Sequence, residues 1–203
     1  MVGGQAQRDD QGRRSGPLAT ALIGAAAGAF GVWALDRLDW WMWRREDPKA
    51  RRRTVAVRPG GEPPAQALVS KVEEAAGSEL SPQSHELAGQ IVHYSIGIAP
   101  AIAYALYRDK LPEQGISRGA LFGLGLFAAQ DEVLNSVTGL GAKPQAYPWQ
   151  AHARGLLAHT LYGVATELAL DAAEQALALA RSRVDARSGS AQEDGSVRRS
   201  MAV

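Results

Sequence analysis

Apolar residues are gathered into four long runs that are separated by polar segments. The first run, residues 17–35, contains no charged side chain, and as a helix its 19 positions cover roughly 28 Å, close to the hydrocarbon thickness of a bilayer. Three further runs, 87–107, 119–140 and 155–176, contain no lysine or arginine, and basic residues lie at their borders instead. This exclusion is typical of membrane spans. The pattern predicts an all-α, multi-pass membrane protein with four transmembrane helices in one bundle. A water-soluble four-helix bundle is the alternative interpretation, because the last two runs are only moderately apolar.

The segments around the runs are polar or rich in glycine, proline and serine. Residues 1–16 and 181–203 are predicted to be disordered, so that the membrane domain covers residues 17–180. Residues 44–85 are predicted to form a basic and proline-rich loop with one short surface helix around residues 65–76.

Tryptophans and basic residues follow the first run directly. Four of the five tryptophans lie between residues 33 and 43, and indole side chains collect at the headgroup level of a bilayer. Residues 44–58 then carry seven basic and two acidic side chains. We expect this cluster to face anionic lipid, although a merely solvated basic loop is the alternative. The cluster contains Arg44, Arg45, Lys49, Arg51, Arg52 and Arg53.

Charge decides neither the orientation nor a soluble partner. Four spans place both termini on the same side as residues 108–118. Each side of the membrane then carries nine basic residues close to it, so the positive-inside rule favours neither orientation. The whole chain has 22 basic and 21 acidic residues, a formal net charge of +1, and nucleic acid is not an expected partner. Nothing in the sequence indicates the oligomeric state.

Small residues recur at the four-residue spacing that brings them to one face of a helix. Because glycine allows two helices to approach closely inside a bilayer, these positions are predicted to pack the bundle. The second and fourth runs each place a histidine between two such glycines. The predicted packing positions are Gly24, Gly28, Gly89, Gly97, Gly119, Gly123, Gly155 and Gly163.

Ionisable side chains in three of the runs are predicted to meet in one buried polar layer. His93 and His159 lie roughly 10 Å in from the same side, and Asp131 and Asn135 bracket this depth on the antiparallel third run. Glu167 continues the face of His159 two turns deeper. A carboxylate in hydrocarbon needs a partner or a proton, and imidazole is the natural neighbour.

The polar layer supports three interpretations. It can respond to or relay protons, it can hold a divalent metal ion, or it can fix the helix register as a hydrogen-bonded contact. The absence of HExxH and ExxH patterns disfavours a metal. The chain has no cysteine, no phosphate-binding glycine loop and no nucleophile–base pair, so the sequence indicates no catalytic residue, no cofactor and no resident metal, and an enzyme is disfavoured.

The chain resembles the YagU-type family of small bacterial inner-membrane proteins, a domain of unassigned biochemical function. The resemblance covers about residues 86–175 and rests on His93 with the following Ser95-Ile-Gly, on Ala103-Tyr-Ala, on Gly139-Leu140, on Pro148-Trp149, and on His159 eight residues before Glu167. It implies a multi-pass protein of the bacterial inner (cytoplasmic) membrane with cytoplasmic termini and a link to acid tolerance. It supplies no catalytic residue.

We therefore expect an integral inner-membrane protein of unassigned activity whose His–carboxylate layer responds to protons. One alternative is a non-catalytic membrane organiser that binds partners or anionic lipid. A second alternative is a membrane-embedded metal site.

Overall fold

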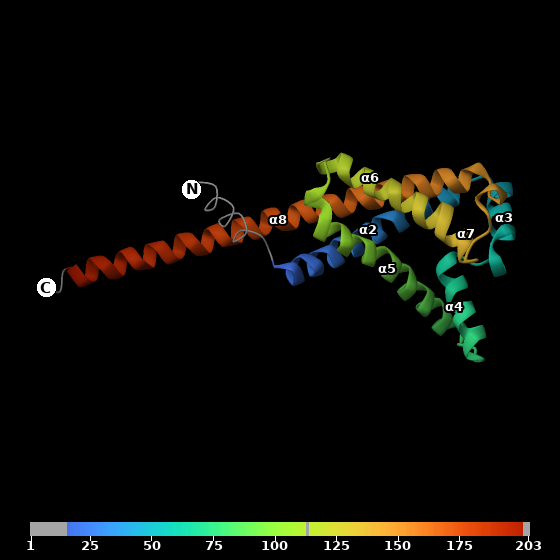
Figure 1. Ribbon diagram of the computed structural model, residues 1–203, viewed down its shortest axis with the longest axis horizontal. Coiled ribbons are helices and arrows are strands. Elements are labelled where there is room, and N and C mark those ends of the chain that lie inside the picture. The colour runs from blue at the N-terminus through green and yellow to red at the C-terminus, as the bar shows by residue number, and fades with distance from the viewer. Residues whose placement is uncertain (1–15, 113, 201–203) are drawn as a thin grey trace.

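The computed structural model describes the backbone of residues 16–112 and 114–200, with side chains described through residue 183. Within these residues all regular structure is helical, which confirms the all-α fold class (Figure 1). The long helices are α2 (Pro17–Arg45), α5 (Pro82–Tyr107), α6 (Gly115–Phe127) and α8 (Trp149–Ser200). Helix α2 packs on both α5 and α8, and α6 packs on α8, so the helices follow the order α5, α2, α8, α6 across the bundle.

Helix α2 continues ten residues beyond the predicted end of the first span at residue 35. No helix-breaking residue interrupts the tryptophan-rich stretch, and the helix ends only where Asp47 precedes Pro48. The ring of a proline disfavours the helical conformation in the residue before it, which explains this end point. Among the described residues, α2 is the one helix whose length and apolar composition together suffice to cross a membrane.

The segment 44–85, predicted to be a loop, is mostly helical, and this prediction was wrong. It contains α3 (Pro48–Val57) and α4 (Pro64–Ala76), and α4 agrees with the surface helix expected around residues 65–76. Asp47 caps α3 by accepting a hydrogen bond from the Lys49 backbone amide at 2.9 Å. Each helix starts with a proline, whose fixed φ suits the first helical turn.

The turn between α4 and α5 depends on an ionised carboxylate. Glu73 accepts a hydrogen bond from the Leu80 backbone amide at 2.6 Å and lies 2.8 Å from His85 Nδ1. The amide of Leu80, followed by His85, lowers the pKa of Glu73 below its usual value. A group with a lowered pKa stabilises the fold above its ordinary pKa, and this stabilisation is lost as the pH falls toward the lowered value.

We therefore expect the amides of residues 77–80 to lose protection from hydrogen exchange when the pH is lowered below about 4.5, after correction for the intrinsic exchange rate. Glu73→Gln should show the reduced protection already at pH 7, whereas Glu74→Gln, on the exposed side of the same turn, should behave as wild type. Equal protection of wild type at neutral and acidic pH would contradict this role.

The third run forms one helical rod with a change of hydrogen bonding in its middle. Helix α6 passes into a π-helix at Ala128–Leu134, and α7 (Asn135–Val137) completes the run. A π-helix widens the turn and moves later residues around the axis, and such segments often occur at functional sites. The acidic pair Asp131 and Glu132 lies in this π-helix.

The fourth run belongs to a helix of 52 residues, α8, which extends well past the other helices (Figure 1). Residues 181–200 continue it, so the prediction of disorder for residues 181–203 was wrong as far as the structure describes that segment. No proline occurs between residues 149 and 200 to end the helix. Residues 1–15 of the predicted disordered N-terminus lie outside the described residues.

Small residues form the antiparallel contact between α2 and α5. Along it the facing pairs are Gly24 with Ala105, Gly28 with Ala101, Val32 with Gly97, and Asp36 with His93. A methyl group on Gly24 would lie 2.8 Å from the Ala105 Cβ, closer than side chains approach. The last pair is polar, and it ends the contact with a hydrogen bond of 2.9 Å between Asp36 Oδ1 and His93 Nε2.

Helices α6 and α8 approach until their backbones touch. A Cβ on Gly119 would lie 2.7 Å from the carbonyl oxygen of Gly163, and one on Gly123 would overlap the carbonyl oxygen of His159. Gly155 faces the ring of Phe127 and the carboxylate of Asp131. The eighth predicted packing glycine, Gly89, faces the Gln66 side chain of α4 instead of a long helix.

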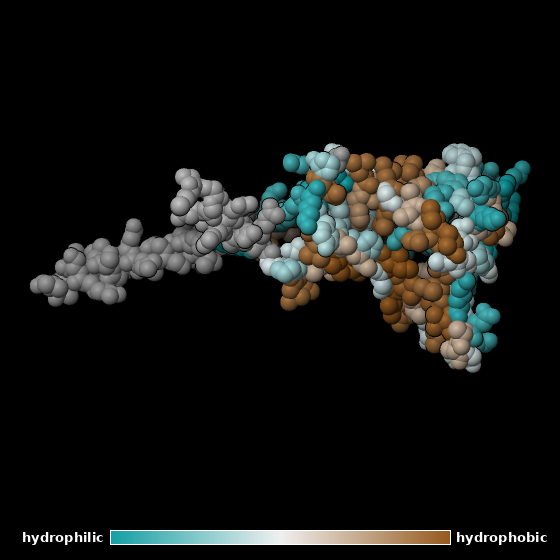
Figure 2. Space-filling view, in the orientation of Figure 1, coloured by the Kyte–Doolittle hydropathy of each residue, from teal (hydrophilic) through white to brown (hydrophobic). Residues whose placement is uncertain are grey.

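The bundle exposes large apolar side chains and buries small and polar ones. Exposed apolar side chains on the four long segments include Leu22, Phe30, Leu87, Ile91, Ile116, Leu121, Leu157 and Leu168. Figure 2 shows hydrophobic residues covering much of the bundle in this view. The buried positions are mainly alanine and glycine, with Tyr162, Thr166 and Glu167 among the most completely buried side chains.

Candidate functional site

The predicted polar layer is divided into three separate groups in the structure. His93 bonds Asp36 of α2 and not a residue of the third run. His159 lies beside Asp131 and Asn135, at one end of the bundle. Glu167 is two turns farther along α8 and bonds arginines there. The expectation of one common layer was therefore wrong, and the pairing of His159 with Asp131 is the part that the structure brings together.

The contact between His159 and Asp131 is made possible by Gly155. His159 Nδ1 lies 3.0 Å from the Gly155 carbonyl oxygen, to which it donates, and 3.6 Å from Asp131 Oδ2. Asn135 Nδ2 approaches Asp131 Oδ1 at 3.5 Å. Because a carbonyl oxygen only accepts, the geometry assigns a proton to His159 Nδ1. Asp131 thus has one imidazole and one amide beside it and no direct arginine bond.

The π-helix turns the neighbouring residue, Glu132, toward α8 as well. Glu132 Oε1 lies 2.6 Å from His152 Nδ1, and His152 Nε2 lies 3.0 Å from the Pro144 carbonyl oxygen. On a regular α-helix, Glu132 points about 100° away from Asp131. Sequence reasoning therefore left Glu132 out of the site, whereas in the structure both carboxylates lie in the π-helix and contact histidines of α8.

The two contacts of His152 together need one more proton than a neutral imidazole and an ionised carboxylate carry between them. The Pro144 oxygen accepts only, so Nε2 carries a hydrogen. The contact of 2.6 Å between Nδ1 and the Glu132 oxygen needs a second hydrogen on one of those two atoms. His152 and Glu132 therefore share a bound proton, whichever of the two atoms carries it.

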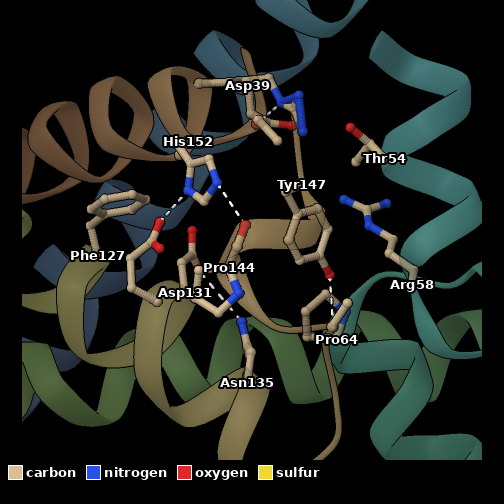
Figure 3. Close-up of a pocket in the computed structure, with 15 residues that line it drawn as sticks. Asp39, Thr54, Arg58, Pro64, Phe127, Asp131, Asn135, Pro144, Tyr147 and His152 are labelled. Atoms are coloured by element: carbon tan, nitrogen blue, oxygen red, sulfur yellow. Dashed lines mark hydrogen bonds and ion pairs between the residues drawn. The ribbon is translucent and has the colours of Figure 1, made fainter. Parts of the chain in front are cut away.

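These groups line a cavity of about 150 Å³ between the end of the bundle, α3 and the loop 141–148 (Figure 3). A polar cavity of this size has room for several water molecules. Its ionisable lining residues come from five parts of the chain and are Asp39, Arg58, Asp131, Glu132, Tyr147, His152 and Arg154. Figure 3 shows the Arg58 side chain directed from α3 toward Tyr147, across from Asp131 and His152.

Two arginines supply the positive charge of the cavity. Arg154 bonds Asp39 at 2.8 Å and Glu46 at 2.7 Å, which ties α8 to the end of α2. Burial, followed by the nearby charge of Arg154, lowers the pKa of Arg58. Trp43 lies between the two guanidinium groups, 4.7 Å from Arg154 and 6.0 Å from Arg58. The side of the cavity that faces α3 therefore carries the positive charge of Arg58.

A second charged cluster closes the other end of the bundle around Glu167. Its side chain is 0% exposed and accepts hydrogen bonds from Arg118 Nε at 3.0 Å and from Tyr104 at 2.6 Å. Arg108 lies 3.1 Å from Glu167 Oε2, the oxygen that also accepts the hydrogen bond of Tyr104. It also pairs with Asp171 and Glu174. Burial alone would lower the pKa of Arg108, but its bonds to Glu174 and Asp171 raise it.

The remaining predictions concern metal ions and the basic cluster. In the part of the chain that the structure describes, no group of three or more histidine, aspartate or glutamate side chains has the geometry to hold a metal ion. Residues of the basic cluster lie at the end of α2 and along α3. Most of them are exposed and Arg51 is partly buried.

Comparison of the chain with family models, with curated proteins and with solved structures yields no match.

Proposed function

We propose that this chain is a four-span integral membrane protein that binds and releases protons at the end of its bundle, through the contacts Glu132–His152 and Asp131–His159. The observation that carries the proton site is the double contact of His152, which needs one bound proton more than a neutral imidazole beside a carboxylate. Histidine is the side chain that proteins most often use to bind and release a proton.

The outward apolar surface supports the membrane location. A water-soluble bundle of this size gains its stability by burying leucine, isoleucine and phenylalanine, and it rarely exposes large contiguous apolar patches. Here those side chains point outward on all four long segments, and glycine, alanine and a buried arginine–glutamate pair fill the interior. This distribution is expected when the surrounding medium is lipid.

Helix lengths support four spans although α2 is the one described helix apolar enough by composition. Helix α5 has 26 residues, which corresponds to roughly 39 Å. The run from α6 through α7 and the bundled part of α8 are of similar length. Some of their polar residues, such as Tyr104, Thr166 and Glu167, face the interior, so their mean composition understates how apolar the outer faces are.

The groups around the proton site come from each packed element. Asp131 contacts His159 and Glu132 contacts His152, both on α8. Arg154 of α8, Asp39 of α2 and Arg58 at the end of α3 line the same cavity as the two acids. A proton bound at one contact changes the charge beside the other, because Asp131 and Glu132 are neighbours in the chain.

The proton site is testable by NMR of histidine and glutamate carboxyl groups in lipid nanodiscs. At neutral pH we expect one proton on either His152 Nδ1 or Glu132, lost as the pH rises. Glu132→Gln should leave His152 singly protonated at neutral pH, and Glu86→Gln, an exposed carboxylate on α5, should change nothing. An ionised Glu132 beside a singly protonated His152 in the wild type at neutral pH would overturn the site.

Liposomes separate proton movement from a purely structural response. With a pH-sensitive dye inside and a pH gradient applied, a relay predicts proton flux that falls when Asp131→Asn and Glu132→Gln are combined. Flux that is unaffected by the combined change removes the relay and leaves a pH-responsive helix contact. The inner-membrane location, the cytoplasmic termini and the link to acid tolerance rest on the YagU resemblance and are proposed on that ground.

A further inference from the structure

The exposed face of α3 carries three basic side chains. Lys49, Arg52 and Arg53 are exposed at positions i, i+3 and i+4 of the helix, so they share one face. The opposite face is buried through Ala50, 6% exposed, and Thr54, 1% exposed. The helix is therefore held by one side and presents its charges on the other.

Of the two acids that lie closest in the sequence, Glu46 is turned toward α8 and Asp47 caps the start of α3. Glu46 has a side chain only 6% exposed and is paired with Arg154 of α8. Asp47 is committed to the Lys49 backbone amide as the cap of α3. Helix α3 itself contains no acidic residue. The face therefore carries a net positive charge, whereas carboxylates pair with Arg108 and Arg118 at the other end of the bundle.

Exposed indoles connect this charged face to the apolar surface of the bundle. Trp40 and Trp41 are 57% and 49% exposed on the last turns of α2, and the Arg45 guanidinium lies 4.3 Å from the centre of the Trp41 ring. Figure 2 shows hydrophilic residues over α3 next to the hydrophobic surface of the bundle. Indole and arginine together are typical of the headgroup layer of a bilayer.

The face is also fixed in position before any ligand arrives. Arg53 Nε donates a hydrogen bond to the Ala146 carbonyl oxygen at 3.1 Å, and this contact joins α3 to the loop 141–148. A charged surface that needs no ordering binds with a smaller entropy loss than a flexible basic loop.

We propose that the face formed by Lys49, Arg52 and Arg53, with Arg44, Arg45 and the exposed indoles beside it, binds the phosphate groups of anionic phospholipids. The continuity with the apolar surface favours a lipid over nucleic acid or an acidic protein, because a lipid offers a phosphate to the basic face and acyl chains to the apolar surface beside it. The inference rests on the proposed membrane location and is independent of the proton site.

Lipid retention tests the inference. The protein is released from nanodiscs that contain equal amounts of phosphatidylglycerol and phosphatidylcholine, and native mass spectrometry counts the lipids that stay bound. Wild type should retain phosphatidylglycerol preferentially. Each neutralised charge near an anionic surface lowers binding about fivefold, so the triple variant Lys49→Gln, Arg52→Gln, Arg53→Gln should lose the preference by about a hundredfold at low salt.

The matched control removes three exposed cations at the other end of the bundle, through Lys110→Gln, Arg181→Gln and Arg183→Gln, and should retain the preference. Equal loss in both triple variants, or wild-type binding to heparin without any preference for phosphatidylglycerol, would overturn the lipid site.

Alkaline carbonate extraction of membranes, run on all variants, separates this inference from the membrane proposal. Wild type that stays in the membrane but shows no lipid preference overturns the lipid site alone. Wild type that is extracted, yet floats with phosphatidylglycerol vesicles in a manner that needs the three cations, overturns the spans and supports the lipid site.

Discussion

Replacing Glu167 with glutamine is expected to destabilise the protein by about 3–5 kcal/mol, the range found when one member of a buried ion pair is removed. The carboxylate is completely buried and accepts bonds from Arg118 and Tyr104. An amide in its place leaves the Arg118 guanidinium without a counter-ion in the interior. Unfolding titrations in mixed micelles measure the change.

Two variants control this prediction. Glu174→Gln removes a carboxylate that also pairs with Arg108 but is 60% exposed, and we expect a change of less than about 1 kcal/mol. The double variant Arg118→Met, Glu167→Leu removes both charges and should be less destabilised than Glu167→Gln alone. A double variant that is the least stable of the set would show that packing, and not charge, explains the effect.

Gly123→Ala is expected to have the second large effect, a loss of about 3 kcal/mol. Its Cβ would overlap the backbone carbonyl of His159, and a backbone cannot move aside as a flexible side chain can. The helices must separate, which also lengthens the contact between Asp131 and His159. Unfolding measurements give the stability, and the NMR shifts of His159 report the separation.

Gly125 provides the matched control for this substitution. It lies two residues away in the same helix, and a Cβ added there meets no atom within 4 Å. Gly125→Ala should therefore be neutral or stabilise the protein by up to about 1 kcal/mol, because alanine favours a helix over glycine. Equal losses for both variants would point to a general effect of glycine in α6 instead of the close helix contact.

The helix packing was predictable from the sequence because close approach leaves a local signature. Gly24, Gly28, Gly119 and Gly123 repeat at four residues, and no other residue type could occupy those positions without overlap. A contact of this kind needs glycine at every fourth position of one helix, so it can be recognised without knowing the partner helix.

The polar contacts were less predictable, because each depends on where two elements meet. Asp36 was overlooked as the partner of His93 since the first span was taken to end at residue 35, whereas α2 continues to Arg45. Arg118 was assigned to the membrane border, yet its long side chain reaches inward to Glu167. Glu132, which contacts His152, lies in a π-helix, and hydrophobic periodicity gives no signal for that helix type.

The two close helix pairs carry the same arrangement of residues. In α2 an aspartate follows the second of two glycines by eight residues, and α6 repeats these spacings with Gly119, Gly123 and Asp131. Each aspartate meets a histidine that is flanked by glycines on the partner helix. The bundle thus contains two similar helix pairs, each with its own aspartate–histidine contact, and we expect that removing one contact leaves the other in place.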